Sequence, residues 1–125
     1  MKYLVGDIGN TLTKLTLLND RFKIIKSKSI DSKKLYKRNY LSIFFKNFFV
    51  SKLNSKILFS SVVPFVYKNV KFYLKSKGYK TYEIKELKVN KIIKLNVDNF
   101  KQVGSDRIVN AIGAYNAHKK NCLII

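Results

Sequence analysis

The 125 residues suffice for one domain with a buried core, and a hydrophobic share of 46% excludes a disordered chain. The apolar runs are far shorter than the roughly 20 residues of a membrane helix, and no signal segment precedes the first apolar stretch, so we expect a cytoplasmic protein without a membrane partner. The only cysteine, Cys122, excludes an internal disulfide. We expect it to be a buried, small apolar side chain.

The formal net charge of +19 points to an anionic partner such as nucleic acid, anionic lipid or a phosphorylated metabolite. Only Arg21, Arg38 and Arg107 are arginines, whereas proteins that read DNA rely on the bidentate guanidinium group. The lysines are scattered among many Asn and Ile residues, which share A/T-rich codons. We therefore favour compositional drift over nucleic-acid binding.

The first third of the chain predicts an antiparallel meander of three strands. Residues 2–7 form an apolar strand, Gly9-Asn10 is a turn signal, and residues 11–18 and 21–28 supply two further strands. From Asp31-Ser32 to about residue 52 we expect one long helix. Its buried face would hold Leu41, Phe44, Phe45, Phe48 and Phe49.

The remainder alternates between strands and helices. Residues 56–62 and 79–84 read as strands around a helix that starts at Pro64, buries Val66, Val70, Tyr73 and Leu74, and ends at Gly78. Residues 89–97 read as strand or extended chain and 98–104 as a loop. Ser105 is expected to cap a last helix that buries Ile108, Ile112 and Tyr115, and residues 122–125 to begin a strand. The order β-β-β-α-β-α-β with a further helix predicts an α/β, ribonuclease-H-like domain of the actin-like ATPase type over residues 1–120. Residues 121–125 would start a second domain.

A carboxylate, a glycine turn and short polar side chains follow one another at the end of the first strand. Glycine lets backbone N–H groups approach an anion closely, lysine adds charge, and Asp7 can hold Mg²⁺ directly or through water. A plain hairpin turn without a bound ligand would explain the same residues. The candidate ATP-phosphate segment consists of Asp7, Ile8, Gly9, Asn10, Thr11, Leu12, Thr13 and Lys14.

A second motif places an acidic residue, Asp106, and a basic residue, Arg107, in the first turn of the last helix, where free N–H groups favour anions. Asp106 could accept a proton from a substrate hydroxyl, and Arg107 could bind a carboxylate bidentately. The alternative is a favourable first-turn acid beside a surface charge. The candidate substrate-binding residues are Gly104, Ser105, Asp106 and Arg107, with Asn110 one turn on.

A third motif, Ser60-Ser61-Val62-Val63-Pro64, is a strand-to-helix junction of the kind that lines ligand crevices in α/β sheets. Together the three motifs resemble the type III pantothenate kinases, actin-like enzymes that make the first intermediate of coenzyme A. The match comprises Asp7, Gly9, Asn10 and Thr11, then 61–64, then Gly104, Asp106, Arg107 and Asn110. The resemblance covers the whole chain but only the amino-terminal half of such a kinase.

The resemblance implies that 7–14 bind the phosphates of Mg-ATP, that 104–107 bind pantothenate, and that Asp106 is the catalytic proton acceptor. It also implies K⁺ or NH₄⁺ activation and a cytoplasmic homodimer. The expected second phosphate motif, with the monovalent-cation ligand and the adenine pocket, is absent from the sequence, so we expect a truncated chain or one completed by a complementary carboxy-terminal half. The family's Tyr-x-Asn-Pro stretch is replaced by Val97, Asn99 and Phe100, which keeps only the Asn.

Two competing hypotheses remain open at this point. One is a basic ribonuclease-H-like module that holds nucleic acid without chemistry, and the other is an inactive relative that binds phosphate only. His118 is expected to be a surface residue beside Lys119 and Lys120.

Overall fold

A computed structural model of the protein describes residues 1–124. Five strands form one mixed sheet in the order β3-β2-β1-β4-β5, with β1–β2–β3 antiparallel and β1, β4 and β5 parallel. This order confirms the predicted meander and the ribonuclease-H-like topology. The strands are β1 (Tyr3–Ile8), β2 (Leu12–Leu18), β3 (Ile24–Asp31), β4 (Lys56–Ser61) and β5 (Lys80–Glu83).

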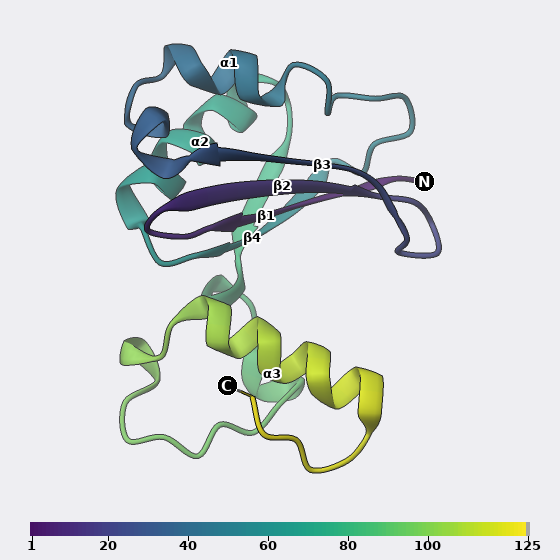
Figure 1. Ribbon diagram of the computed structural model, residues 1–125, viewed down its shortest axis with the longest axis vertical. Coiled ribbons are helices and arrows are strands. Elements are labelled where there is room, and N and C mark those ends of the chain that lie inside the picture. The colour runs from purple at the N-terminus through teal and green to yellow at the C-terminus, as the bar shows by residue number, and fades with distance from the viewer. Residues whose placement is uncertain (125) are drawn as a thin grey trace.

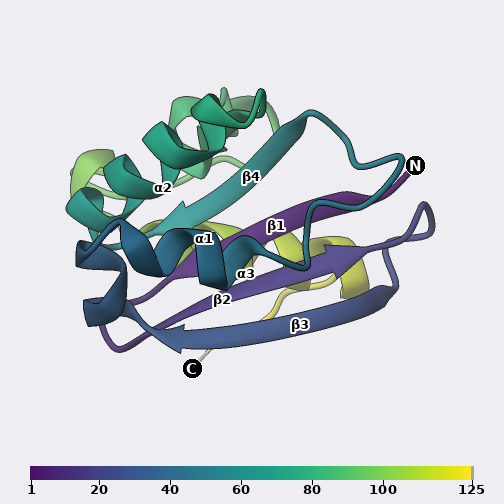
Figure 2. The same ribbon diagram turned by 90° about the horizontal axis from the view of Figure 1, so that it is seen from above.

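The helices lie on both faces of the sheet, as Figures 1 and 2 show. Helices α1 (Asn39–Phe45) and α2 (Pro64–Ser76) cover one face, and α3 (Ser105–His118) lies on the opposite side. Pro64 occupies the first turn of α2, and Gly78 follows its end with φ +82°, as predicted. Alternate side chains of β1 and β2 are buried under α1 and α2, so the strands present their other side chains toward α3.

The prediction of one helix from 31 to 52 is wrong. A 3₁₀ turn (Ser32–Tyr36) is followed by Lys37 in extended conformation, and α1 starts only at Asn39. Leu35 and Leu41 are both fully buried. In a continuous helix these two positions would point about 120° apart, because successive residues turn by about 100°. The break lets both leucines reach the same core.

The main core lies between the sheet and the helices α1 and α2, and it contains the predicted aromatic cluster. Leu41, Phe44, Phe45 and Phe48 are buried, and Phe49 packs against them partly exposed. Val66, Val70 and Leu74 of α2 are buried as expected, and Tyr73 is partly buried against them.

The region after β5 departs further from the sequence-based expectation. Residues 89–97 form no strand but a 3₁₀ turn (Val89–Lys91) and irregular chain, and a second such turn (Phe100–Gln102) lies in the predicted loop. Gly104 rather than Ser105 is the N-cap of α3, and Ser105 is its buried first residue. A small separate core forms around Ile84, Val89 and Ile108, with Ile112 packed against it.

The carboxyl end of the chain differs from the sequence-based expectation at all but one of the predicted positions. Tyr115 is exposed rather than buried, and Cys122 is exposed, with its thiol donating to the Lys120 carbonyl oxygen at 3.2 Å. Residues 121–124 have no strand conformation, and the last residue of the expected strand, Ile125, lies outside the described residues. His118 is exposed, as expected. Within residues 1–124, no helix is long and apolar enough to cross a bilayer.

Gly6 of β1 is required by packing rather than by backbone conformation, because a Cβ atom there would collide with the Phe59 ring. We expect Gly6→Ala to lower the free energy of unfolding by about 1–3 kcal/mol, the range for overpacked cores. Gly113→Ala is the matched control, since nothing lies within 4 Å of a Cβ there and alanine favours a helix. Urea titration measures both variants, and equal stability of the two would contradict the packing argument.

Candidate active site

The three sequence motifs meet at one edge of the sheet. The parallel strands β1 and β4 end there, and the Val62 N–H continues their ladder by donating to the Ile8 carbonyl oxygen at 3.0 Å. The start of α3 lies against the same edge, since Ser105 lines a cavity of about 270 Å³ together with Ser61 and Pro64. Carboxyl ends of parallel strands are the usual place for ligands in α/β sheets.

The turn between β1 and β2 presents two free backbone donors. The Gly9 N–H is occupied, donating to the Leu12 carbonyl oxygen at 3.0 Å. Ser32, the residue after β3, closes the turn by donating its hydroxyl to the Gly9 carbonyl oxygen at 2.6 Å. The N–H groups of Asn10 and Thr11 have no hydrogen-bond partner within the described chain. These two N–H groups, rather than that of Gly9, are available to an anion.

Side chains of the 7–14 segment divide between core and surface. Ile8 and Thr13 are fully buried, and the Thr13 hydroxyl bonds to the Ser32 hydroxyl at 2.9 Å. Their side chains therefore fix the hairpin and leave ligand contacts to the backbone. Leu12 is exposed, as are the polar side chains of Asn10 and Thr11.

Asp7 and Lys14 are paired in the β1–β2 register and both are exposed on the face toward α3. Both line a cavity of about 290 Å³ that Val109 of α3 also lines, which places α3 opposite the phosphate segment. The Asp7 carboxylate makes no hydrogen bond or ion pair with any described residue. It is therefore free to bind a ligand.

The metal-binding groups at this site suit a magnesium ion that arrives with a phosphate ligand better than a metal held by protein side chains alone. No group of three or more His, Cys, Asp or Glu side chains gathers anywhere in residues 1–124. Mg²⁺ is usually held by one or two carboxylates, water and substrate phosphates. One unpaired carboxylate at Asp7, followed in the sequence by two free N–H groups at Asn10 and Thr11, matches that pattern.

The Gly104–Arg107 segment forms the N-terminal turn of α3. The Gly104 carbonyl oxygen accepts from the N–H groups of Arg107 and Ile108 at 3.1 and 3.3 Å. A Cβ on Gly104 would collide with Oδ1 of Asp106, so glycine leaves room for that carboxylate. Asp106, Arg107 and Asn110 line one cavity of about 480 Å³ with Ile124. An acid and a guanidinium group thus face the same space, as a substrate carrying both a hydroxyl and a carboxylate requires.

A network that the sequence did not reveal supports the β4–α2 junction. The Glu83 carboxylate accepts from the Ser61 N–H at 3.3 Å and the Lys85 N–H at 2.8 Å, which ties the junction to the turn after β5. Glu86 accepts from the Glu83 N–H and pairs with Lys71 at 2.8 Å. A capping signal built on Glu-x-x-Glu is weak, because Ser and Thr are the usual N-cap residues.

The protonation states around Glu86 follow from these contacts. Burial disfavours the Glu86 charge, but the hydrogen bonds from Lys71 and the Glu83 N–H outweigh it and place the pKa of Glu86 below its ordinary value. The hydrogen bond to Glu86 raises the pKa of Lys71, and burial raises the pKa of Tyr67. Both partners of the ion pair are nearly half exposed, so the pair adds little stability.

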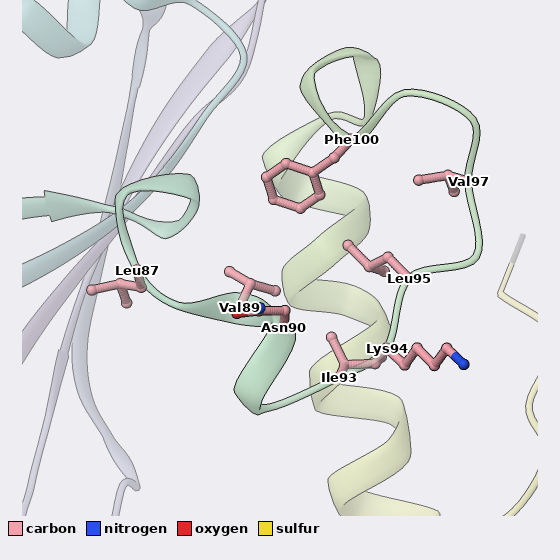
Figure 3. Close-up of a pocket in the computed structure, with 8 residues that line it drawn as sticks. All are labelled: Leu87, Val89, Asn90, Ile93, Lys94, Leu95, Val97 and Phe100. Carbon is pink, nitrogen blue, oxygen red and sulfur yellow. The ribbon is translucent and has the colours of Figure 1, made fainter.

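The residues that replace the Tyr-x-Asn-Pro stretch have local structural roles. Val97 and Phe100 line an apolar cavity of about 420 Å³ beside α3, together with Val89, Ile93 and Leu95 (Figure 3). The Asn99 side chain accepts from the Lys101 N–H at 3.0 Å and so caps the 3₁₀ turn that leads to Gly104. The retained asparagine therefore positions the approach to the second motif.

Comparisons with known proteins show the family of the chain. The family profile described as Type III pantothenate kinase matches residues 3–125. The chain belongs to the type III pantothenate kinase family. The Type III pantothenate kinase of Pelagibacter ubique (strain HTCC1062) is 42% identical over 98% of the chain, and that of Fervidobacterium nodosum (strain ATCC 35602 / DSM 5306 / Rt17-B1) is 32% identical over the same share.

The chain spans about half the length of these curated relatives, 49% of each. Among solved structures, the Lmo2764 protein of Listeria monocytogenes is 20% identical, with a TM-score of 0.46 over 66% of this chain and 34% of that one. Membership of a kinase family favours an enzyme over the nucleic-acid-binding alternative.

Proposed function

We propose that the protein transfers the γ-phosphoryl group of ATP to the primary hydroxyl of pantothenate, giving 4′-phosphopantothenate, the first step of coenzyme A biosynthesis. One observation carries the proposal. In a chain of this family, the turn after β1 that carries the free donors and the start of α3, which bears Asp106 and Arg107, lie at the same edge of the sheet.

The residues have complementary tasks in this reaction. The Asn10 and Thr11 N–H groups and the Lys14 ammonium bind the phosphate oxygens and stabilise their charge. Arg107 pairs bidentately with the pantothenate carboxylate, which orients the hydroxyl. Asp106 accepts the hydroxyl proton as the oxygen attacks phosphorus, the new O–P bond forms, and the bond to the ADP oxygen breaks in line.

Asp7 would hold Mg²⁺, directly or through water. Bound there, the ion would neutralise phosphate charge. K⁺ or NH₄⁺ activation, a homodimeric or complemented assembly and a cytoplasmic location belong to the same proposal and rest on the family alone.

The assay is pantothenate-dependent release of ADP by the full-length natural protein, with Mg²⁺ and K⁺ present. In that assay we expect Arg107→Lys to raise the pantothenate KM by about tenfold or more with a small change in kcat, because lysine cannot form the bidentate pair. Arg21→Lys, in the turn after β2, is the matched control and should behave as wild type. ADP release that does not depend on pantothenate would overturn the assignment of pantothenate as the substrate.

A further inference from the structure

Two polar side chains that make no hydrogen bond with any described residue occupy neighbouring positions on the face of the sheet toward α3. Asp7 of β1 and Ser60 of β4 are partners in the parallel register, and both line the 290 Å³ cavity. We infer that Ser60 is a positioning residue for Asp7: its hydroxyl donates to the Asp7 carboxylate when nucleotide and metal are bound. This inference rests on the proposed function, which gives Asp7 its metal–phosphate role.

Ser60 is not explained by packing. Its side chain is 6% exposed, and its hydroxyl has no hydrogen-bond partner among residues 1–124. A buried hydroxyl without a partner destabilises a fold, so alanine would suit this position better. The Ser60 hydroxyl lines the same cavity as the unpaired Asp7 carboxylate, which gives it a use in another state of the site.

The register places the two groups within reach of one another. Neighbouring strands are about 4.8 Å apart, and residues paired across them project to the same face. Alternation along β4 confirms that face, since Ile57 and Phe59 enter the main core whereas Leu58 and Ser60 line the cavity. Rotation of serine between its three staggered χ1 positions redirects the hydroxyl without moving the backbone.

The chemistry requires such a partner. Asp7 has Lys14 on one side, in the β1–β2 register, and Ser60 on the other. A hydrogen bond from Ser60 to one carboxylate oxygen would fix the rotamer of Asp7 and leave the second oxygen for the hydrated cation. Partners that orient a metal-binding carboxylate contribute about 10–100-fold to metal affinity.

The test measures Mn²⁺ binding in the presence of ADP by electron paramagnetic resonance, on the full-length natural protein. We expect Ser60→Ala to weaken Mn²⁺ binding by about tenfold while the protein becomes equally or more resistant to urea. Ser60→Thr keeps the hydroxyl and should restore binding. The Ser60→Ala enzyme should need about tenfold more Mg²⁺ than wild type to reach half of its maximal turnover. Its kcat at saturating Mg²⁺ should change less.

Thr81→Val is the matched control, because Thr81 also carries a buried hydroxyl but lies on β5, outside this cavity. It should leave Mn²⁺ binding unchanged. Asp7→Ala separates the two levels of the argument. If Asp7→Ala abolishes Mn²⁺ binding and Ser60→Ala does not weaken it, the role of Ser60 is refuted; if Asp7→Ala has no effect, the proposed function of the site fails first.

Discussion

Asp106→Asn should lower kcat for pantothenate phosphorylation by about 10²-fold or more, while both substrates still bind. Asparagine keeps the size and much of the polarity of the side chain but cannot accept the hydroxyl proton. Asp106 is exposed in the first turn of α3 and makes no hydrogen bond with other described side chains, so the fold does not depend on its charge. Steady-state kinetics with both substrates varied measures the effect.

Asp98→Asn is the control for this measurement. Asp98 is exposed in the loop before the 3₁₀ turn, and removing its charge raises the net charge of the protein by the same single unit. The control should retain the wild-type kcat. An Asp106→Asn enzyme with unchanged kcat would remove Asp106 from the mechanism, and equal losses in both variants would indicate a general electrostatic effect.

Local patterns predicted most of the fold because the sheet is encoded by short-range alternation. In β1 and β2 every second residue is buried, and such a period is visible in one sequence. The end of α2 at Gly78 is likewise set by the left-handed conformation that glycine allows. The topology then brings the Asp7 and Gly104 motifs to one edge.

What the sequence could not predict depends on tertiary contacts. The break at Lys37 lets both Leu35 and Leu41 enter the core, and their burial depends on the sheet and α2. The apolar run at Cys122 predicted burial, yet the thiol is exposed after Lys119, whose left-handed conformation ends α3. The support of Ser61 by Glu83 joins residues 22 positions apart and has no local signature.

At the candidate site, the sequence predicted which segments matter but not which of their backbone atoms are free. It singled out Gly9 for its small size, and the structure shows that the Gly9 N–H closes the turn while Asn10 and Thr11 carry the free donors. A Cβ on Gly9 would lie 3.0 Å from the Leu12 carbonyl oxygen, so the glycine shapes the hairpin that holds those donors. The sequence did not predict that the Ser60 hydroxyl lacks a hydrogen-bond partner, because serine is a common residue in strands and its burial depends on tertiary packing.

The largest loss should come from Asp7→Ala, which we expect to lower ATP turnover by about 10³-fold. Asp7 is the only carboxylate among the residues lining the cavity between the sheet and α3, so no described neighbour there can replace it. Its side chain is exposed and unpaired, and the free energy of unfolding should therefore change by less than about 0.5 kcal/mol. Turnover and urea titration on the same preparation test both halves of this expectation.

Gly9→Val supplies the complementary case at the same hairpin. Its Cβ would crowd the Leu12 carbonyl oxygen and move the Asn10 and Thr11 N–H groups, so turnover should fall with the Asp7 carboxylate still in place. Asp20→Ala, an exposed acid in the opposite turn of the meander, should leave turnover unchanged. Full activity of Asp7→Ala would refute the phosphate assignment. Full activity of Gly9→Val alone would instead show that the hairpin donors tolerate displacement, leaving metal binding by Asp7 as the dominant contribution.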